Sequence, residues 1–291
     1  MQIFFQNVIG GIEAGSLYAL AALGLVLIYR TAKMSNFAQG TIGMFNAYVA
    51  YYILARTKLP LPIVAVLSVI VAFAIGTIIE LLIMRNASKS IAMGKPILTL
   101  GLIIVFQGMA PMIFGPVPFQ FPRFIQTPAM DIGGVKMLPN TLLTIAVTLV
   151  LVSALFYVLQ STKWGLAVRV TAANETTARL MGVPTRLVSL GAWGIATALG
   201  ALAAIMVAPL TSVTVTMMET IHLNSFIAAI LGGFSTFHGP VIGAFILGIA
   251  NNLISYYISS KWVVAILYSS ILVFTIFKPQ GLFGQKMIKK V

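Results

Sequence analysis

The stretch PIVAVLSVIVAFAIGTIIELLIM at residues 62–84 contains a single charged side chain, Glu80. A helix of about 20 apolar residues crosses the hydrocarbon core of a bilayer, so this stretch predicts a membrane span. The whole chain has the same character, because 59% of its residues are hydrophobic and only 8% are charged. A soluble domain would have too few polar side chains to cover its surface. The sequence therefore predicts an all-α integral membrane protein.

Further apolar runs predict a polytopic helical bundle. They lie at residues 8–29, 36–55, 96–114, 139–159, 187–210, 240–258 and 262–277. One more run, at residues 226–234, is too short to cross alone and is flanked by polar His222, Asn224 and Ser225. It predicts a re-entrant segment or one half of a broken helix. We expect eight to nine spans, one of them short or broken, in a single transmembrane domain that covers residues 1–291.

The basic residues fall unevenly on the two sides of this topology. Those on one side are Arg30, Lys33, Arg85, Lys89, Lys95, Lys163, Arg169, Arg179, Arg186, Lys278, Lys286, Lys289 and Lys290. The other side has only Arg56, Lys58, Arg123, Lys136 and Lys261. Cytoplasmic loops carry the excess of lysine and arginine, so we predict an outer N-terminus and a cytoplasmic C-terminus. A basic inner face beside anionic lipid explains the net charge of +13 without nucleic acid.

One long polar segment separates apolar runs, KWGLAVRVTAANETTARLMGVPTR at residues 163–186. Its pattern predicts a helix over residues 172–181. Thr171 is a suitable cap before this helix, and Gly182 suits the left-handed position after it. Pro184 prevents the helix from continuing. The loop at residues 161–186 is therefore a candidate docking element on the inner side.

The predicted helix has a surface that suits contact with a partner protein. Glu175 and Arg179 are four residues apart, with the acid nearer the N-terminus, which favours an ion pair. Small residues would let a partner approach closely, and they are Ala172, Ala173 and Ala178. Spacing alone equally allows an ordinary inner loop with a helical turn lying on the membrane.

Several kinds of chemistry are poorly supported by the sequence. The chain has no cysteine and only two histidines, so we expect no metal centre and no enzyme active site. A phosphate-binding loop needs G-x-x-x-x-G-K-[ST], and the nearest sequence, Gly94-Lys95-Pro96, lacks the second glycine and the hydroxyl residue. We therefore expect any nucleotide hydrolysis to come from another protein, and no cofactor in this chain.

Four pieces of the chain resemble, in order, the permease subunits of branched-chain amino acid ABC importers. The polar loop ANETTARLMGVPTR at residues 173–186 resembles the cytoplasmic coupling loop of that family. The other three are IYRTAKMSNFAQGTIGMFNAY at residues 28–48, LGGFSTFHGPVIGAFILG at residues 231–248 and KPQGLFG at residues 278–284. The chain length resembles that of the shorter, LivH-type subunit more than the longer, LivM-type one.

The resemblance implies a set of partners in a bacterial plasma (inner) membrane. They are a second permease subunit, two cytoplasmic ATPases that bind ATP and Mg, and an extracytoplasmic solute-binding protein. The polar helix would then couple an ATPase to transport through Ala172, Ala173, Asn174, Glu175, Ala178, Arg179 and Gly182. A self-contained secondary transporter or channel for a small polar solute is the alternative function. The sequence leaves open which amino acid or amide is carried and whether the core is a heterodimer.

Uncharged polar residues within the spans are the candidates for the substrate pathway. They are Asn36, Gln39, Asn46, Gln107, Asn224 and Ser225. A zwitterionic amino acid in transit needs hydrogen bonds, and helix N-termini at Asn36 and Asn224 would direct their dipoles at its carboxylate. The alternative role for these residues is hydrogen bonding between helices.

The remaining polar and small residues have simpler interpretations. We favour hydrogen-bonded or interfacial roles over proton transfer for Glu13 and Glu80, and also for His222 and His238. The G-x-x-x-G at residues 239–243 predicts close helix packing, within the chain or with another subunit. Prolines in and just before residues 115–138 mark this loop as irregular. These prolines are Pro111, Pro116, Pro118, Pro122 and Pro128.

The four motifs also depart from the family pattern at single positions. Gln39 stands where the family usually has histidine, and Thr41 stands where an acid is common. Ser235, Thr236, His238 and Pro240 replace the usual glycine, serine, proline and alanine. These departures lie near the expected pathway segments, so they concern the substrate more than the architecture.

Overall fold

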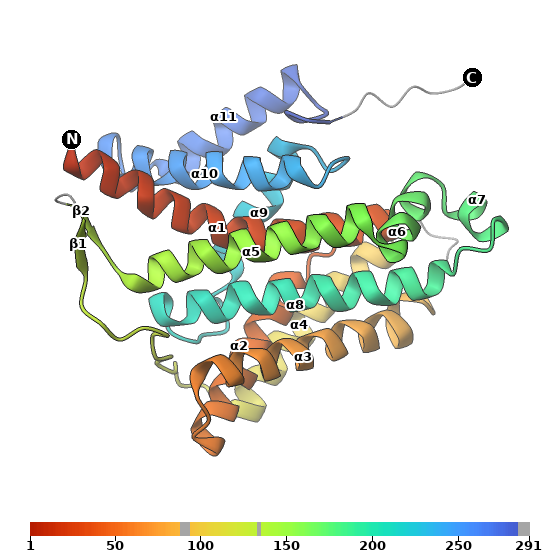
Figure 1. The fold of residues 1–291 in the computed structure, drawn as a ribbon, viewed down its shortest axis with the longest axis horizontal. Helices are drawn as coiled ribbons and strands as arrows, with labels where there is room; N and C mark the ends of the chain where they lie inside the picture. Colours follow the sequence, from red (N-terminus) through yellow and green to blue (C-terminus); the bar gives the residue numbers. More distant parts are fainter. Residues whose placement is uncertain (88–93, 133–134, 285–291) are drawn as a thin grey trace.

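The computed structural model describes residues 1–87, 94–132 and 135–284, which form a helical bundle with one short β-hairpin (Figure 1). The helices are α1 (Gln2–Ala32), α2 (Gln39–Thr57), α3 (Leu61–Ile79), α4 (Gly94–Phe114), α5 (Pro139–Ser161), α6 (Lys163–Ala173), α7 (Glu175–Leu180), α8 (Thr185–Thr211), α9 (Glu219–Gly232), α10 (His238–Tyr257) and α11 (Val263–Phe277). A π-helical turn, η1 (Glu80–Met84), continues α3, and strands β1 (Met130–Ile132) and β2 (Val135–Met137) pair antiparallel. Lys89, Lys286, Lys289 and Lys290 lie outside the described residues.

Each of the predicted apolar runs folds as a helix. Within the described ranges, 6 helices are long and apolar enough to cross a membrane: α1, α3 with η1, α4, α5, α8 and α10. The helix α2 is less apolar, and α11 is apolar but only 15 residues long. The all-α polytopic class is confirmed, while eight to nine crossings and the orientation of the termini stay predictions.

The short run at residues 226–234 belongs to a longer helix than its apolar residues indicate. Helix α9 begins at Glu219, so Asn224 and Ser225 lie inside it rather than before it. It ends before Gly233, whose φ of 97° is left-handed. The predicted helix N-terminus at Asn224 is therefore wrong. Asn36, in contrast, lies three residues before the first residue of its helix, because α2 begins at Gln39.

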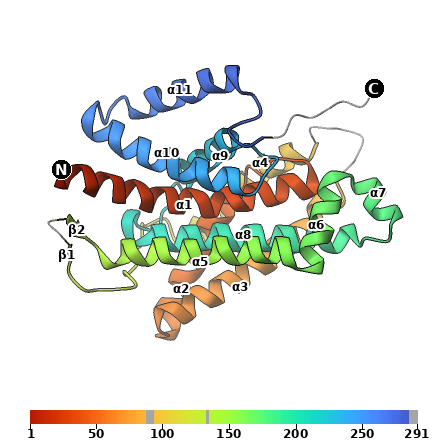
Figure 2. The same ribbon diagram turned by 45° about the horizontal axis from the view of Figure 1, so that its top comes forward.

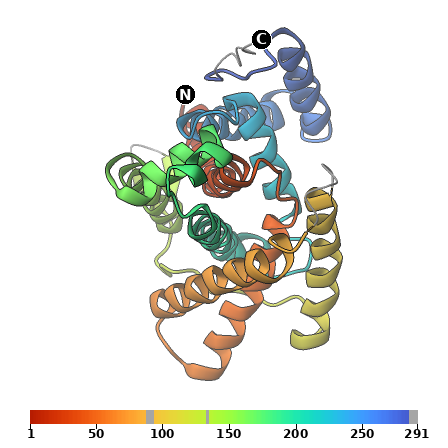
Figure 3. The ribbon, with the colours of Figure 1, turned by 90° about the vertical axis from the view of Figure 1, so that its right-hand side faces the viewer.

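Helix α1 forms the centre of the bundle. It packs against α10, α8, α9 and α5, and Figure 3 shows it enclosed when the molecule is viewed along its long axis. In the most apolar part of α1, 83% of the residues are buried, against 22% in α4. The apolar parts of α3, α4 and α5 are only 33%, 22% and 28% buried, so these helices form the outer wall of the bundle.

Glycines allow the central helices to approach closely. A Cβ atom at Gly11 would lie 2.5 Å from the Cα of Ile249, so α1 and α10 cross almost backbone to backbone. Cβ atoms at Gly239 and Gly243 would meet the backbone of α9 at Gly232 and Ala228. The predicted packing role of the G-x-x-x-G motif is confirmed, and the contact lies within the chain.

We expect Gly243→Leu to destabilise the fold, because the added side chain must separate α10 from α9. Overpacking of this kind costs roughly 1–3 kcal/mol. Gly101→Leu on α4 is the matched control, since a Cβ there meets no atom within 4 Å. Thermal unfolding of the detergent-purified protein measures the difference. Equal melting temperatures for the two variants would contradict the assignment.

The loop before α5 is mostly irregular, as its prolines predict, but it has two ordered features. One is the hairpin β1–β2, and the other is an isolated bridge that pairs Phe119 with Val213. Pro111 lies inside α4 rather than in the loop, so this proline is wrongly assigned by the sequence pattern.

Candidate functional site

The polar segment folds as two short helices rather than one. Helix α6 ends at Ala173, and Asn174 is extended, with φ −155° and ψ 107°. The Oδ1 atom of Asn174 accepts a hydrogen bond from the backbone N–H of Thr177 at 3.0 Å, which caps α7. The predicted single helix over residues 172–181 is therefore wrong at its start. Thr171 is buried within α6 and does not act as the cap.

The end of the segment is as predicted. Gly182 has a φ of 81°, a left-handed conformation that glycine adopts without strain. Pro184 precedes Thr185, the first residue of α8. The two short helices are thus held between long membrane helices, with α7 projecting at the end of the bundle opposite the N-terminus (Figures 1 and 2).

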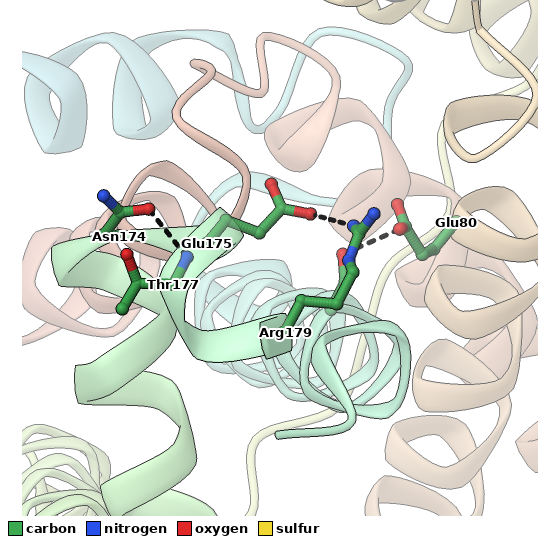
Figure 4. A network of polar contacts seen from close by, with 6 residues as sticks. Glu80, Asn174, Glu175, Thr177 and Arg179 are labelled. Carbon is green, nitrogen blue, oxygen red and sulfur yellow. Dashed lines mark hydrogen bonds and ion pairs between the residues drawn. The ribbon is translucent and has the colours of Figure 1, made fainter. Parts of the chain in front are cut away.

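The surface of α7 differs from the small-residue surface that the sequence indicates. Ala172 and Ala178 are buried, so they face the bundle. Leu180 and Met181 are instead 84% and 73% exposed. The predicted ion pair is confirmed, since a guanidinium nitrogen of Arg179 lies 2.6 Å from Oε1 of Glu175 (Figure 4). The exposed face of α7 therefore combines an ion pair with two large apolar side chains, while Ala173 and Asn174 are exposed beside it.

The two carboxylates within the spans each accept a hydrogen bond from another helix. Thr141 Oγ1 donates to Glu13 Oε2 at 2.9 Å, and Ser189 Oγ donates to Glu80 Oε1 at 2.7 Å. These contacts confirm the hydrogen-bonded role predicted for both acids. Figure 4 shows Glu80 close to the ion pair of α7, and both line a cavity of about 220 Å³.

Two of the predicted pathway residues, Asn36 and Gln39, are buried around the start of α2. Asn36 Oδ1 accepts a hydrogen bond from the N–H of Ala38 at 3.0 Å. Gln39 Nε2 donates to the carbonyl oxygens of Ala21 at 3.0 Å and Ala196 at 3.3 Å. Gln39 therefore links α2 to α1 and α8 through hydrogen bonds, as expected for the alternative role of hydrogen bonding between helices.

Three more pathway candidates are also buried and bonded. Asn224 Oδ1 accepts a hydrogen bond from the Tyr268 hydroxyl at 3.0 Å, which links α9 to α11. Asn46 and Ser225 each donate to a carbonyl one turn earlier in their own helix, at 2.8 and 2.6 Å. All five buried residues thus make hydrogen bonds inside the fold.

The sixth candidate, Gln107, lines a cavity of about 520 Å³ between α2, α4 and α9. Its Nε2 atom donates to Oε1 of Glu219 at 3.2 Å. Glu219 is exposed, so the cavity opens at the molecular surface beside this pair. The lining residues are Phe37, Gly40, Thr41, Met44, Ile103, Gln107, Val215, Met218, Glu219, His222, Leu223 and Phe226.

The shape of this cavity depends on a close contact between α2 and α9. A Cβ atom at Gly40 would lie 2.6 Å from the Cβ of His222, so glycine makes room for the imidazole. Beside them, the rings of Phe37 and Phe226 are 5.8 Å apart. The cavity therefore combines one acid–amide pair with apolar and aromatic walls, a lining that suits a small molecule with a polar end and an apolar end.

Sequence reasoning missed Glu219 because this residue precedes the apolar run at residues 226–234. It placed His222 at the end of a span, whereas His222 is inside α9 and on the cavity wall. A carboxylate a few residues before a short apolar run was the available signal.

Comparison with known proteins adds a finding to this geometry. Residues 7–276 match the family described as the permease component of the branched-chain amino acid transport system. The chain belongs to this permease family. The resemblance to this family is thereby confirmed, and the permease is a multi-pass membrane transport protein.

Curated relatives cover nearly the whole permease. A probable branched-chain amino acid transport permease protein, LivH, from Methanocaldococcus jannaschii is 30% identical over 261 residues, which are 87% of this chain and 82% of the relative. The high-affinity permease protein LivH of Salmonella typhimurium is 27% identical, with 99% and 98% of the two chains covered. BraD of Pseudomonas aeruginosa is 24% identical at the same coverage. No solved structure matches the permease.

Four of the permease's six departures from the family motifs differ in their surroundings. Gln39 bonds neighbouring helices, and Thr236 Oγ1 accepts a hydrogen bond from the N–H of Gly239 at 3.3 Å, so these two positions serve packing. The ring of His238 lies 5.5 Å from that of Phe283. Thr41, in contrast, lines the large cavity.

Proposed function

We propose that the permease forms half of the translocation pathway of an ATP-driven importer for branched-chain amino acids or related small amino acids and amides. The cavity between α2, α4 and α9 carries this proposal. Its acid–amide pair, Glu219 and Gln107, suits the ammonium group of an amino acid, and its apolar wall suits an aliphatic side chain. Because the cavity is open at the surface, a second permease subunit, LivM-type or an identical copy, would close it.

The α6–α7 segment is the proposed contact for a cytoplasmic ATPase, which would bind ATP and Mg. The position of α7 at one end of the bundle supports this role, as do its exposed Leu180 and Met181. In this arrangement α7 faces the cytoplasm of a bacterium, and the N-terminus faces an extracytoplasmic solute-binding protein. The helices α2 and α11, together with partial crossing by α9, would complete eight to nine spans.

Reconstitution into liposomes tests this function against a self-contained transporter. We expect uptake of radiolabelled leucine only when the permease is combined with its second permease and its ATPases. The binding protein must be outside the liposome, and ATP must be inside it on the ATPase side. Uptake by this chain alone, driven by a sodium or proton gradient, would overturn the proposal. Omitting each partner in turn identifies which of them transport requires.

A further inference from the structure

Two neighbouring cavities at the α7 end of the bundle share a set of arginines. The smaller has a volume of about 220 Å³ and the larger about 500 Å³. Both are lined by Arg85 at the end of η1, Arg179 of α7 and Arg186 in the first turn of α8. The end of η1, far away in the sequence, thus contributes an arginine to the same cavities as α7 and the start of α8.

The shared region has a surplus of positive charge. Lys95 joins the three arginines in the smaller cavity, and the carboxylates there are Glu80 and Glu175. Glu80 accepts a hydrogen bond from Ser189, and Glu175 is paired with Arg179. Across the described part of the chain, no ion pair involves Arg85, Lys95 or Arg186. Glu80 interacts electrostatically with Lys95 and Arg85. Two carboxylates do not balance four cations, so the cavity keeps a net positive charge that favours an anionic ligand.

The larger cavity adds an apolar wall to this charge. Its lining includes Val183, Leu187 and Leu190, and Leu187 is 63% exposed. Leu82, one turn before Arg85, is 61% exposed. The arginines thus lie where apolar, outward-facing helix surface ends and polar chain begins, which is the depth at which lipid headgroups meet a membrane protein.

We propose that these two neighbouring cavities bind the headgroup phosphate of an anionic phospholipid, with an acyl chain along Leu187 and Leu82. Arginine forks form paired hydrogen bonds to phosphate oxygens, which lysine does not reproduce. The N-terminal turn of α8, which contains Arg186, adds the positive end of a long helix dipole.

The apolar wall favours a lipid over a free anion. A soluble phosphate would use only the arginines, whereas a phospholipid also covers the exposed leucines. The net positive lining likewise favours an anionic headgroup over a zwitterionic one. Since Arg85 and Arg186 come from different membrane helices, the bound lipid would bridge the end of η1 and the start of α8.

Native mass spectrometry of the permease complex in nanodiscs tests the site. The nanodiscs contain phosphatidylcholine with graded amounts of phosphatidylglycerol, and the measured quantity is the phosphatidylglycerol retained. An arginine near the surface strengthens binding of anionic lipid about fivefold. We therefore expect Arg85→Gln/Arg186→Gln to weaken retention roughly 25-fold. The matched control, Lys163→Gln/Arg169→Gln, removes two positive charges from α6 that line neither cavity, and it should retain lipid like the unmodified protein.

Two further arms separate the possible outcomes. Arg85→Lys/Arg186→Lys keeps the charge and a folded protein but loses the paired hydrogen bonds, so we expect an intermediate loss of retention. Glycerol 3-phosphate added to phosphatidylcholine nanodiscs should not raise the melting temperature as phosphatidylglycerol does. Equal loss of lipid in the control variant, or stabilisation by glycerol 3-phosphate alone, would overturn the proposal. Loss of lipid retention when the ATPase is bound would also overturn the proposal, because the ATPase would then occupy the surface around the two cavities.

Discussion

Glu219→Gln is expected to lower ATP-dependent leucine uptake by the reconstituted transporter roughly 10- to 100-fold, because a hydrogen bond to a charged group contributes about 1.5–3 kcal/mol. Glu219 is the carboxylate among the residues that line the large cavity in the described chain. Glutamine has the same shape, and it can still bond Gln107. The variant therefore removes the negative charge that attracts a substrate ammonium group while changing little else.

Two companions to this variant distinguish a substrate contact from a structural role. Glu219→Asp keeps the charge, so we expect partial recovery of uptake. Glu13→Gln removes a carboxylate bonded to Thr141 on a different part of the bundle. A single bond of this kind contributes about 0.6 kcal/mol, so the rate of uptake should stay within about threefold of the unmodified value. Initial uptake rates at several leucine concentrations provide the measurement. Normal leucine uptake by Glu219→Gln, or a larger loss in Glu13→Gln, would contradict the assignment.

Features governed by composition or by near neighbours were predictable from the sequence. The apolar runs fold as helices because a bilayer requires about 20 apolar residues in a row, whatever lies around them. The pair Glu175–Arg179 forms because residues four apart on a helix are adjacent. The left-handed Gly182 follows from the local stop signal before Pro184.

Features that depend on distant contacts were not predictable. Both Thr171 and Asn174 are able to cap a helix, and the choice rests on the burial of Thr171 and Ala172 within α6. The start of α9 at Glu219 depends on partners in α2 and α4, far away in the sequence. The two acceptors of Gln39, the carbonyls of Ala21 and Ala196, lie far away in the sequence, while its place in the substrate pathway stays a prediction.

Leu180→Asp/Met181→Asp is expected to reduce co-purification of the ATPase with the permease by at least about 30-fold. Both side chains are largely exposed at the end of α7, so burying them against a partner would make them central contacts. Loss of such a contact typically costs 2 kcal/mol or more, and a carboxylate left in an apolar interface adds a desolvation cost. Substrate-stimulated ATP hydrolysis should disappear with the association. The stability of the permease itself should stay unchanged, because the replaced side chains are already in contact with solvent.

Thr176→Asp provides a control on the same short helix. Thr176 is exposed, and an acid in the first turn of α7 favours the helix dipole, so this variant should fold. It adds negative charge to α7 without touching Leu180 or Met181, and we expect it to retain the ATPase. Retention by both variants would show that α7 is not the docking helix. Loss in both would mean that the partner covers α7 on all its exposed sides, so the apolar end would not be the deciding face. Only selective loss in the Leu180→Asp/Met181→Asp variant supports docking through the apolar end of α7.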